Sequence, residues 1–174
     1  DAPCSGEGTL RRRGGRVPNQ SRSFLAHVTR LQRLLLEKAV RVTRPGGIIL
    51  YATCTFSPEE NEAVVSDALE RLPIELEPLS LSVTHAAGLS SFEGLRFDPR
   101  LEGAARIYPQ HLDSGGLFLA KLRKLDDGRV ADGNGWSVVP TVFPHGDPSS
   151  FDAELRLRNG VAELTERFGL KRAL

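Results

Sequence analysis

The stretch RPGGIILYATCTFSPEENE, residues 44–62, decides the fold of this chain. Its proline and glycines end any helix that precedes them, and the apolar run 48–52 is short and unbroken. Such a run is typical of a parallel strand that is buried on both faces. The signals of a helix start follow at 57–60. Ser57 can serve as the N-cap, Pro58 stands at the first helical position, and Glu60 is the acid of a capping box. The stretch therefore predicts a buried strand, a short loop and a helix.

The segments on either side continue this alternation of helices and strands. Apolar residues recur every three or four positions through 23–43, which predicts an amphipathic helix capped by Ser21 or Ser23. The apolar residues of its predicted buried stripe are Phe24, Leu25, Val28, Leu31, Leu34, Leu35, Ala39 and Val42. Strand patterns follow the second helix at 74–81 and 116–122. This order predicts the second half of a doubly wound α/β sheet.

The composition is that of an ordinary globular domain. Of the 174 residues, 40% are hydrophobic and 26% are charged, which excludes the disordered, collagen-like and coiled-coil classes. No stretch approaches the ~20 consecutive apolar residues of a membrane span, and no signal-peptide pattern is visible. We therefore expect a cytoplasmic protein without membrane association. The chain has no methionine and opens directly on a dense motif at Asp1, so we expect it to be part of a longer protein.

The character of the sequence changes after Lys124. We expect residues 1–124 to belong to the α/β domain, and residues 125–174 to be a linker followed by the start of an accessory segment. The linker is rich in Asp and Gly. Beyond it, apolar residues at helical spacing over 150–169 predict a short final helix with Ser150 as its cap.

Charge is distributed unevenly along the chain. Residues 1–50 carry ten Lys and Arg against three acids, which is +7, whereas residues 51–100 carry nine acids against three Arg, which is −6. Part of the positive charge lies in a Gly-flanked cluster formed by Arg11, Arg12, Arg13 and Arg16. Guanidinium groups in such a loop suit RNA phosphates, because their planar fork matches a phosphate group. The alternative is a solvated loop with no binding role.

Both cysteines stand where a thiol can meet a ligand. Cys54 follows the predicted strand and precedes the predicted helix, at the edge where open α/β sheets bind ligands and helix N–H groups favour a thiolate. Cys4 lies in a Pro-Cys-Ser-Gly turn rather than in a core segment. A Cys4–Cys54 disulfide is the structural alternative, which a reducing compartment disfavours. A metal site is not predicted, because neither cysteine has a second Cys or His at ligand spacing.

The two cysteine motifs together resemble a known family. The motifs are DAPCSG at 1–6 and YATCTFSPEENE at 51–62. They are similar to the paired motifs of the Nop/Sun family of S-adenosylmethionine-dependent RNA cytosine-5 methyltransferases. RIYPQH at 106–111 and GGLFLAKLRK at 115–124 extend the resemblance, and their form is most similar to the RsmF-type bacterial enzymes that act on small-subunit ribosomal RNA. The resemblance implies a Rossmann-like class I methyltransferase sheet, of which 1–124 would be the C-terminal half.

The resemblance also implies a role for each motif residue. Cytosine C5 is a poor nucleophile, so a thiolate must first add to C6 of the ring before C5 can take a methyl group. By resemblance, Cys54 is that nucleophile and Cys4 is associated with release of the methylated product. Asp1 matches the acid that hydrogen-bonds the cytosine edge, with a turn carboxylate as the alternative. Asp1, Ala2 and Pro3 are expected to contact the cofactor S-adenosylmethionine.

Compared with that family, the chain lacks the segments that would hold most of the cofactor and the upstream RNA-binding segment. We therefore expect it to be inactive alone and to need the missing N-terminal half of the same protein, with which it would form a monomer. The RNA could be ribosomal or transfer RNA. A non-catalytic RNA-binding module and a generic thiol enzyme using Cys54 stay open as alternatives. The acids Glu59, Glu60 and Glu62 are interpreted as helix-start residues rather than catalysts.

Overall fold

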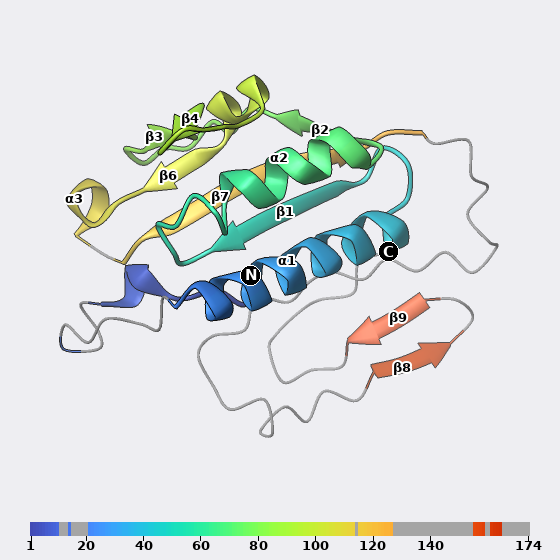
Figure 1. Cartoon of the computed structure of the whole chain (residues 1–174). Coiled ribbons are helices and arrows are strands. Elements are labelled where there is room, and N and C mark those ends of the chain that lie inside the picture. Colours follow the sequence, from blue (N-terminus) through green and yellow to red (C-terminus); the bar gives the residue numbers. More distant parts are fainter. Residues whose placement is uncertain (11–13, 15–20, 114, 127–154, 159–160, 165–174) are drawn as a thin grey trace.

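The centre of the molecule is a five-stranded sheet (Figure 1). The computed structural model describes residues 1–10, 14, 21–113, 115–126, 155–158 and 161–164. The strands of this sheet are β1 (Ile48–Thr53), β2 (Ile74–Glu77), β3 (Ala86–Ala87), β6 (Ala105–Ile107) and β7 (Leu117–Lys124). β7 lies in the middle, with β1 along one edge and with β2 and β6 end to end along the other. β3 extends the sheet beyond β6.

Every strand pair in the described sheet is antiparallel. The parallel pairing predicted for 48–52 is therefore wrong within the part of the chain that the structure describes. The two faces of β1 also differ, because Ile49 and Tyr51 are buried whereas Ile48 and Leu50 are 45% and 49% exposed. An apolar run shows that a strand can be buried on both faces, but it specifies neither the direction of its neighbour nor what covers each face.

Two helices pack on one face of the sheet. α1 (Arg22–Val42) and α2 (Glu62–Arg71) lie side by side in front of β1 and β7 (Figure 1). Their buried residues form one core with the strands, whose largest members include Leu36, Val40, Tyr51, Val64, Leu69, Leu101, Phe118 and Leu122. The predicted helix–strand–helix order is thus confirmed, and the packing holds the loop between β1 and α2 at one end of the sheet.

The buried face of α1 differs from the predicted stripe. The helix is capped by Ser21, whose hydroxyl accepts a hydrogen bond from the Phe24 amide at 3.3 Å. Leu34, Leu35 and Val42 of the predicted stripe are exposed. The buried residues of the helix are Val28, which belongs to the predicted stripe, and Thr29, Gln32, Leu36 and Val40, which do not. The helix carries apolar residues on two faces, so their spacing alone does not say which face meets the sheet.

α2 begins at Glu62, which is later than the predicted start. The Ser57 carbonyl accepts the Glu60 amide at 3.2 Å, and the chain makes turns before the helix starts. The predicted capping box does not form, because the Glu60 carboxylate binds the amide of Ser5 instead. A loop thus separates Cys54 from the helix, so the expected help of helix N–H groups to its thiolate is not supported.

The remaining described elements are short. They are η1 (Glu7–Thr9), β4 (Ser91–Phe92), β5 (Leu95–Arg96), η2 (Pro99–Gly103) and α3 (Pro109–Leu112). Among the described residues, no helix combines the length and the apolar character that crossing a membrane requires.

The described part of the C-terminal segment is a pair of strands. β8 (Leu155–Arg158) and β9 (Val161–Leu164) pair antiparallel, so the helix predicted over 150–169 is wrong at these positions. The sequence of 155–158 alternates Leu and Arg with the period of a strand. Asn-Gly, which follows at 159–160, is a dipeptide strongly favoured at hairpin turns. These local signals outweigh the helical spacing, and the domain boundary at Lys124 stays a prediction.

Candidate active site

Two loops meet at the carboxyl end of β1 and bring the two cysteines together. Residues 54–61, the Cys54 loop, follow β1 directly, and residues 1–10, the Cys4 loop, lie before α1. The two Sγ atoms are 3.4 Å apart, a hydrogen-bonding distance and far longer than the ~2.05 Å of a disulfide bond. Both residues are partly buried, and neither forms a disulfide. The disulfide alternative is therefore not what the structure contains.

The contact couples the protonation of the two thiols. The hydrogen bond to Cys54 and burial both raise the pKa of the Cys4 thiol. Two thiolates this close would repel each other, so the pair keeps at least one proton near neutral pH. With Cys4 protonated, its S–H can donate to the sulfur of Cys54. The pair can therefore hold one proton and one thiolate.

Side chains tie the Cys4 loop to the Cys54 loop. The Ser5 amide donates to both carboxylate oxygens of Glu60, at 3.0 and 2.9 Å, and the hydroxyls of Ser5 and Thr55 are 2.9 Å apart. In the other direction, Glu7 accepts the Phe56 amide at 2.9 Å and the Thr55 hydroxyl at 3.1 Å. Burial raises the pKa of the Glu60 carboxyl, and the hydrogen bonds from Ser5 oppose that rise. Each loop thus provides a carboxylate that holds the other.

A buried glutamine on α1 holds the start of the Cys4 loop. Gln32 Nε2 donates to the Pro3 carbonyl at 2.8 Å, and the Ala2 amide donates to the Ala52 carbonyl of β1 at 2.7 Å. Gln32 Oε1 is buried without a hydrogen-bond partner in the described part of the chain. The side chains of Asp1 and Pro3 are exposed. The loop is therefore fixed through its backbone while these two residues stay accessible to a ligand.

Two glycines allow the loops to come this close. The Gly8 amide donates to the Cys54 carbonyl at 2.8 Å. A Cβ atom on Gly8 would lie 2.6 Å from that carbonyl oxygen and from the Gly116 nitrogen, and a Cβ atom on Gly116 would overlap the ring of Phe56. Side chains cannot be accommodated against backbone at such distances. Any larger residue at Gly8 must therefore push the two cysteine loops apart.

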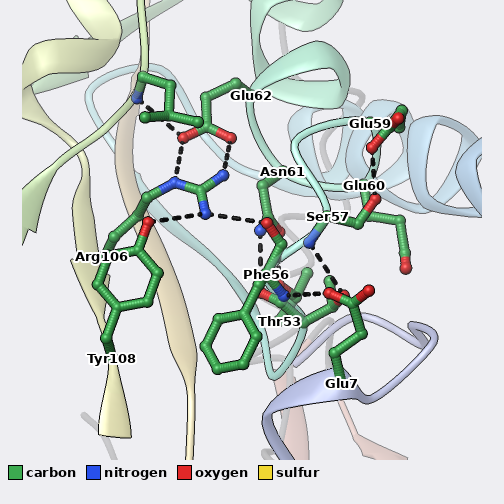
Figure 2. A network of polar contacts seen from close by, with 12 residues as sticks. Glu7, Thr53, Phe56, Ser57, Glu59, Glu60, Asn61, Glu62, Arg106 and Tyr108 are labelled. Carbon is green, nitrogen blue, oxygen red and sulfur yellow. Dashed lines mark hydrogen bonds and ion pairs between the residues drawn. The ribbon is translucent and has the colours of Figure 1, made fainter. Parts of the chain in front are cut away.

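A buried ion pair lies beside the Cys54 loop. Arg106 of β6 and Glu62 at the start of α2 are 3% and 0% exposed, and their charged groups make a two-armed contact. Figure 2 shows the guanidinium between this carboxylate and the carbonyl of Phe56, which accepts from Arg106 Nη1 at 3.0 Å. Burial alone would lower the pKa of Arg106, but its bonds to Glu62 outweigh that effect and the pKa is raised. The arginine therefore stays charged.

The structure brings some of the predicted site residues together and leaves others undescribed. Cys4 and Cys54 are in contact, and Asp1, Ala2 and Pro3 lie on the same loop as Cys4. The predicted RNA-contacting residues Arg11, Arg12, Arg13 and Arg16 lie outside the described residues. Among the described residues, no group of three or more His, Cys, Asp or Glu side chains could hold a metal ion.

Sequence reasoning missed the residues that support the loops. Of the acids interpreted as helix-start residues, Glu62 does lie in the first turn of α2 but also binds Arg106, and Glu60 lies before the helix and holds Ser5. Gln32 carried a usable signal, because it is a polar residue on a buried helical stripe. Glu7 carried none, since an acid between two glycines in a turn is ordinarily solvated.

Comparisons with known proteins agree on one family. The family model described as 16S rRNA methyltransferase RsmB/F matches residues 1–123. The chain is 36% identical over 127 residues to the ribosomal RNA small subunit methyltransferase F of Erwinia tasmaniensis, covering 72% of this chain and 25% of that protein. It is 33% identical over 124 residues to the tRNA (cytosine(49)-C(5))-methyltransferase of Pyrococcus abyssi, covering 71% and 40%.

Solved structures give the same result. A methyltransferase homologue from Pyrococcus horikoshii superposes with a TM-score of 0.62 at 37% identity, covering 72% of this chain and 37% of that one. NSun6 from the same organism, solved with SFG, superposes with a TM-score of 0.56 at 31% identity, covering 73% and 29%. The chain spans between a quarter and two fifths of the length of these curated relatives. The predicted fold class and family resemblance are confirmed: the chain has a Rossmann-like methyltransferase fold and belongs to the RsmB/F family of 16S rRNA methyltransferases.

Proposed function

We propose that the protein containing this chain methylates C5 of cytosine in RNA through a covalent adduct on Cys54. The observation that carries the proposal is the 3.4 Å contact between the sulfur atoms of Cys4 and Cys54. A thiol pair that shares a proton at an accessible loop junction suits a reaction in which one sulfur attacks the ring and the other assists its departure. Membership of a family of RNA methyltransferases supports RNA as the substrate, and we infer that the protein acts as a monomer in the cytoplasm.

Each residue has a defined part in this reaction. Cys54 thiolate forms a bond to C6 of cytosine and pushes electron density to C5. S-adenosylmethionine, when bound, supplies the methyl group. For release, a base such as the Cys4 thiolate or a water molecule accepts the proton on C5, and the electron pair of that C–H bond forms the C5=C6 double bond as the bond between C6 and sulfur breaks, so that Cys54 leaves as a thiolate. Cys4 is the group beside the leaving sulfur, and Asp1 hydrogen-bonds the cytosine edge, where charge develops in the adduct.

The residues present fit part of a cofactor site. Asp1 and Pro3 are exposed, and the Pro3 backbone is held by Gln32, whose buried Oε1 has no partner in the described part. Asp1, Ala2 and Pro3 would hold S-adenosylmethionine on this side. Residues of the same protein outside 1–174 supply the rest, so this chain alone is inactive. Isothermal titration should show no S-adenosylmethionine binding to residues 1–174 alone, and binding once the N-terminal half is added.

A covalent trapping experiment tests the proposed reaction. RNA that contains 5-fluorocytosine cannot lose its C5 substituent, so the adduct on Cys54 should accumulate and survive denaturation. The protein expressed from its complete gene should form this adduct, and its Cys54→Ala variant should not. RNA binding without any adduct would instead favour the non-catalytic RNA-binding module. An adduct that persists in Cys54→Ala would assign the nucleophile elsewhere.

Two RNA classes are candidates for the substrate. Similarity to the proteins named ribosomal RNA small subunit methyltransferase F favours ribosomal RNA, and the Pyrococcus abyssi relative named for a tRNA cytosine favours transfer RNA. We infer small-subunit ribosomal RNA, because the family model is described for 16S rRNA. Bisulfite sequencing of both RNA classes after incubation with the protein should find new 5-methylcytosine in small-subunit ribosomal RNA. Methylation confined to tRNA would reverse the assignment.

A further inference from the structure

Arg106 connects the core of the molecule to the Cys54 loop. Its Nε and Nη2 atoms donate to the two oxygens of Glu62, and Nη1 donates to the Phe56 carbonyl at 3.0 Å. Nη1 also lies 3.4 Å from the Tyr108 hydroxyl, and the guanidinium carbon lies 5.7 Å from the centre of the Phe118 ring. The side chain is 3% exposed. Glu62 therefore holds the guanidinium through Nε and Nη2, while Nη1 contacts the Cys54 loop.

Phe56, two residues after Cys54, is held at its amide, its carbonyl and its ring. Its amide donates to Glu7 at 2.9 Å, and its carbonyl accepts from Arg106. Its ring stacks on Tyr108, with centroids 5.6 Å apart and planes inclined by 30°, and packs against the backbone of Gly116. Because only Thr55 lies between Cys54 and Phe56, fixing Phe56 limits how far Cys54 can move.

We propose that Arg106 is a positioning residue for the Cys54 nucleophile, which it aligns by holding the Phe56 carbonyl while Glu62 anchors the guanidinium. This inference rests on the proposed function, because it assumes that Cys54 attacks the substrate. Arg106 itself touches neither substrate nor sulfur in this arrangement.

Core stability alone does not explain this geometry. A buried ion pair is generally no more stabilising than well-packed apolar residues of similar size. An arginine is required only where a fixed, forked donor must satisfy several acceptors at once. Here Nε and Nη2 of the guanidinium bind Glu62, and Nη1 donates to the backbone of the Cys54 loop. The arrangement suits alignment, because displacement of a reacting group by ~1 Å can cost about a hundredfold in rate.

Two variants remove the loop contact while limiting damage to the core. Glu62→Gln combined with Arg106→Met removes both buried charges, and Gln keeps an acceptor for the Leu89 amide, which bonds Glu62 at 3.0 Å. Arg106→Lys keeps a charge beside Glu62, but the three donors of its ammonium group radiate from one nitrogen and cannot reproduce the planar fork that spans Glu62 and the Phe56 carbonyl. Arg100→Met is the matched control, because the exposed Arg100 pairs with Asp98 at the start of η2.

The kinetic test uses the protein expressed from its complete gene. We expect kcat for methyl transfer to fall at least about tenfold in the double variant, with KM for RNA changed by less than about twofold. Arg106→Lys should give a smaller fall of the same type, and the control should match the wild type. Each variant must retain cooperative thermal unfolding for its kcat to be compared with that of the wild type. If the double variant does not fold, the kcat of Arg106→Lys decides whether Arg106 positions Cys54. Equal kcat in the wild type and Arg106→Lys, or a loss confined to KM, would overturn the inference.

A second measurement separates this inference from the proposed function. Alkylation by iodoacetamide, followed by peptide mass spectrometry, gives the ratio of Cys54 to Cys4 modification without RNA or cofactor. We expect this ratio to change at least about threefold in the Arg106 variants and not in Arg100→Met. An unchanged ratio overturns the positioning role. Full turnover by Cys54→Ala overturns the proposed function instead, whatever the alkylation ratio shows.

Discussion

The two cysteine loops are both largely buried and differ in where they are open: the Cys4 loop buries Ser5, Gly6, Gly8 and Thr9 but has two exposed residues at its start, whereas no residue of the Cys54 loop is exposed. The Cys54 loop is enclosed, since most of its side chains and the strand end that leads into it are buried. Its buried residues are Thr55, Ser57, Pro58, Glu60 and Asn61, preceded by Thr53. The Cys4 loop begins with the exposed Asp1 and Pro3, and its contacts run to α1, to β1 and to the Cys54 loop.

This difference matches the two parts of a covalent reaction. A nucleophile must be aligned closely with the atom it attacks, so it gains from a loop that is fixed on several sides. Groups that contact the substrate edge and assist release must be reached by the ligand. The loop with exposed residues therefore suits Asp1 and Cys4, and the enclosed loop suits Cys54.

The largest effect should come from exchanging the two cysteines for alanine in the complete protein. Cys54→Ala should abolish both methyl transfer and adduct formation, because no other sulfur is aligned for attack. Cys4→Ala should still form the adduct and accumulate it, because release is impaired. Methyl incorporation into RNA measures the transfer, and a gel shift of RNA under denaturing conditions measures the adduct. If Cys4→Ala cannot attack while Cys54→Ala keeps turnover, the roles of the two loops are reversed.

A smaller but still large effect is expected from separating the loops. Gly8→Ala places a Cβ atom 2.6 Å from the Cys54 carbonyl oxygen, so the Cys4 loop must move away. We expect a loss of about tenfold to a hundredfold in kcat, measured by methyl incorporation. Gly46→Asn is the control, because its added Cβ meets no atom within 4 Å and asparagine tolerates its φ of +75°. Unchanged kcat in Gly8→Ala would mean that contact between the loops is dispensable.

A moderate effect on binding is predicted for the arginines that follow the Cys4 loop. Replacing Arg11, Arg12 and Arg13 by Ala should weaken binding to all RNA sequences alike, because a Gly-flanked cluster suits phosphates rather than bases. The slope of log K against log salt should flatten by up to ~0.7–0.9 for each phosphate group that is no longer neutralised. Filter binding at several salt concentrations measures it. A weakening restricted to one RNA sequence would contradict a phosphate role.

The smallest effect concerns the carboxylate that joins the loops. Because burial raises the pKa of Glu60, the folded state binds its proton more tightly than the unfolded state. Its contribution to stability is therefore present at low pH and is lost as the pH rises through the folded-state pKa. Glu60→Gln lacks this titration, so the unfolding free energy of the variant relative to the wild type should improve as the pH rises from the ordinary glutamate pKa of about 4.3 through the raised folded-state pKa.

Urea denaturation at several pH values provides this comparison. Glu75→Gln is the control, because Glu75 is an exposed glutamate on β2. A relative stability of Glu60→Gln that falls with rising pH would show that Glu60 is stabilised as a carboxylate in the folded state.

Local patterns in the sequence were sufficient for much of the fold and for the chemical residues. The spacing of apolar residues predicted α1 within a residue at either end, and the runs at 48–52 and 116–122 predicted β1 and β7. The cysteine motifs identified both Cys4 and Cys54. These features are encoded by residues near one another along the chain, because helix period, strand length and turn chemistry are local properties.

Only the tertiary structure decided the direction of strand pairing, the buried face of α1 and the use of the polar residues around the site. The sequence around Glu60 predicts a capping box, but its carboxylate binds the amide of Ser5, which is 55 residues away in the chain. Glu62 likewise pairs with Arg106, which is 44 residues away. A carboxylate removed from water must accept hydrogen bonds, and the donors that the fold brings to Glu60 and Glu62 are not encoded in the neighbouring sequence. The two cysteines proposed to react could thus be recognised locally, whereas the groups that hold them depend on packing between distant segments.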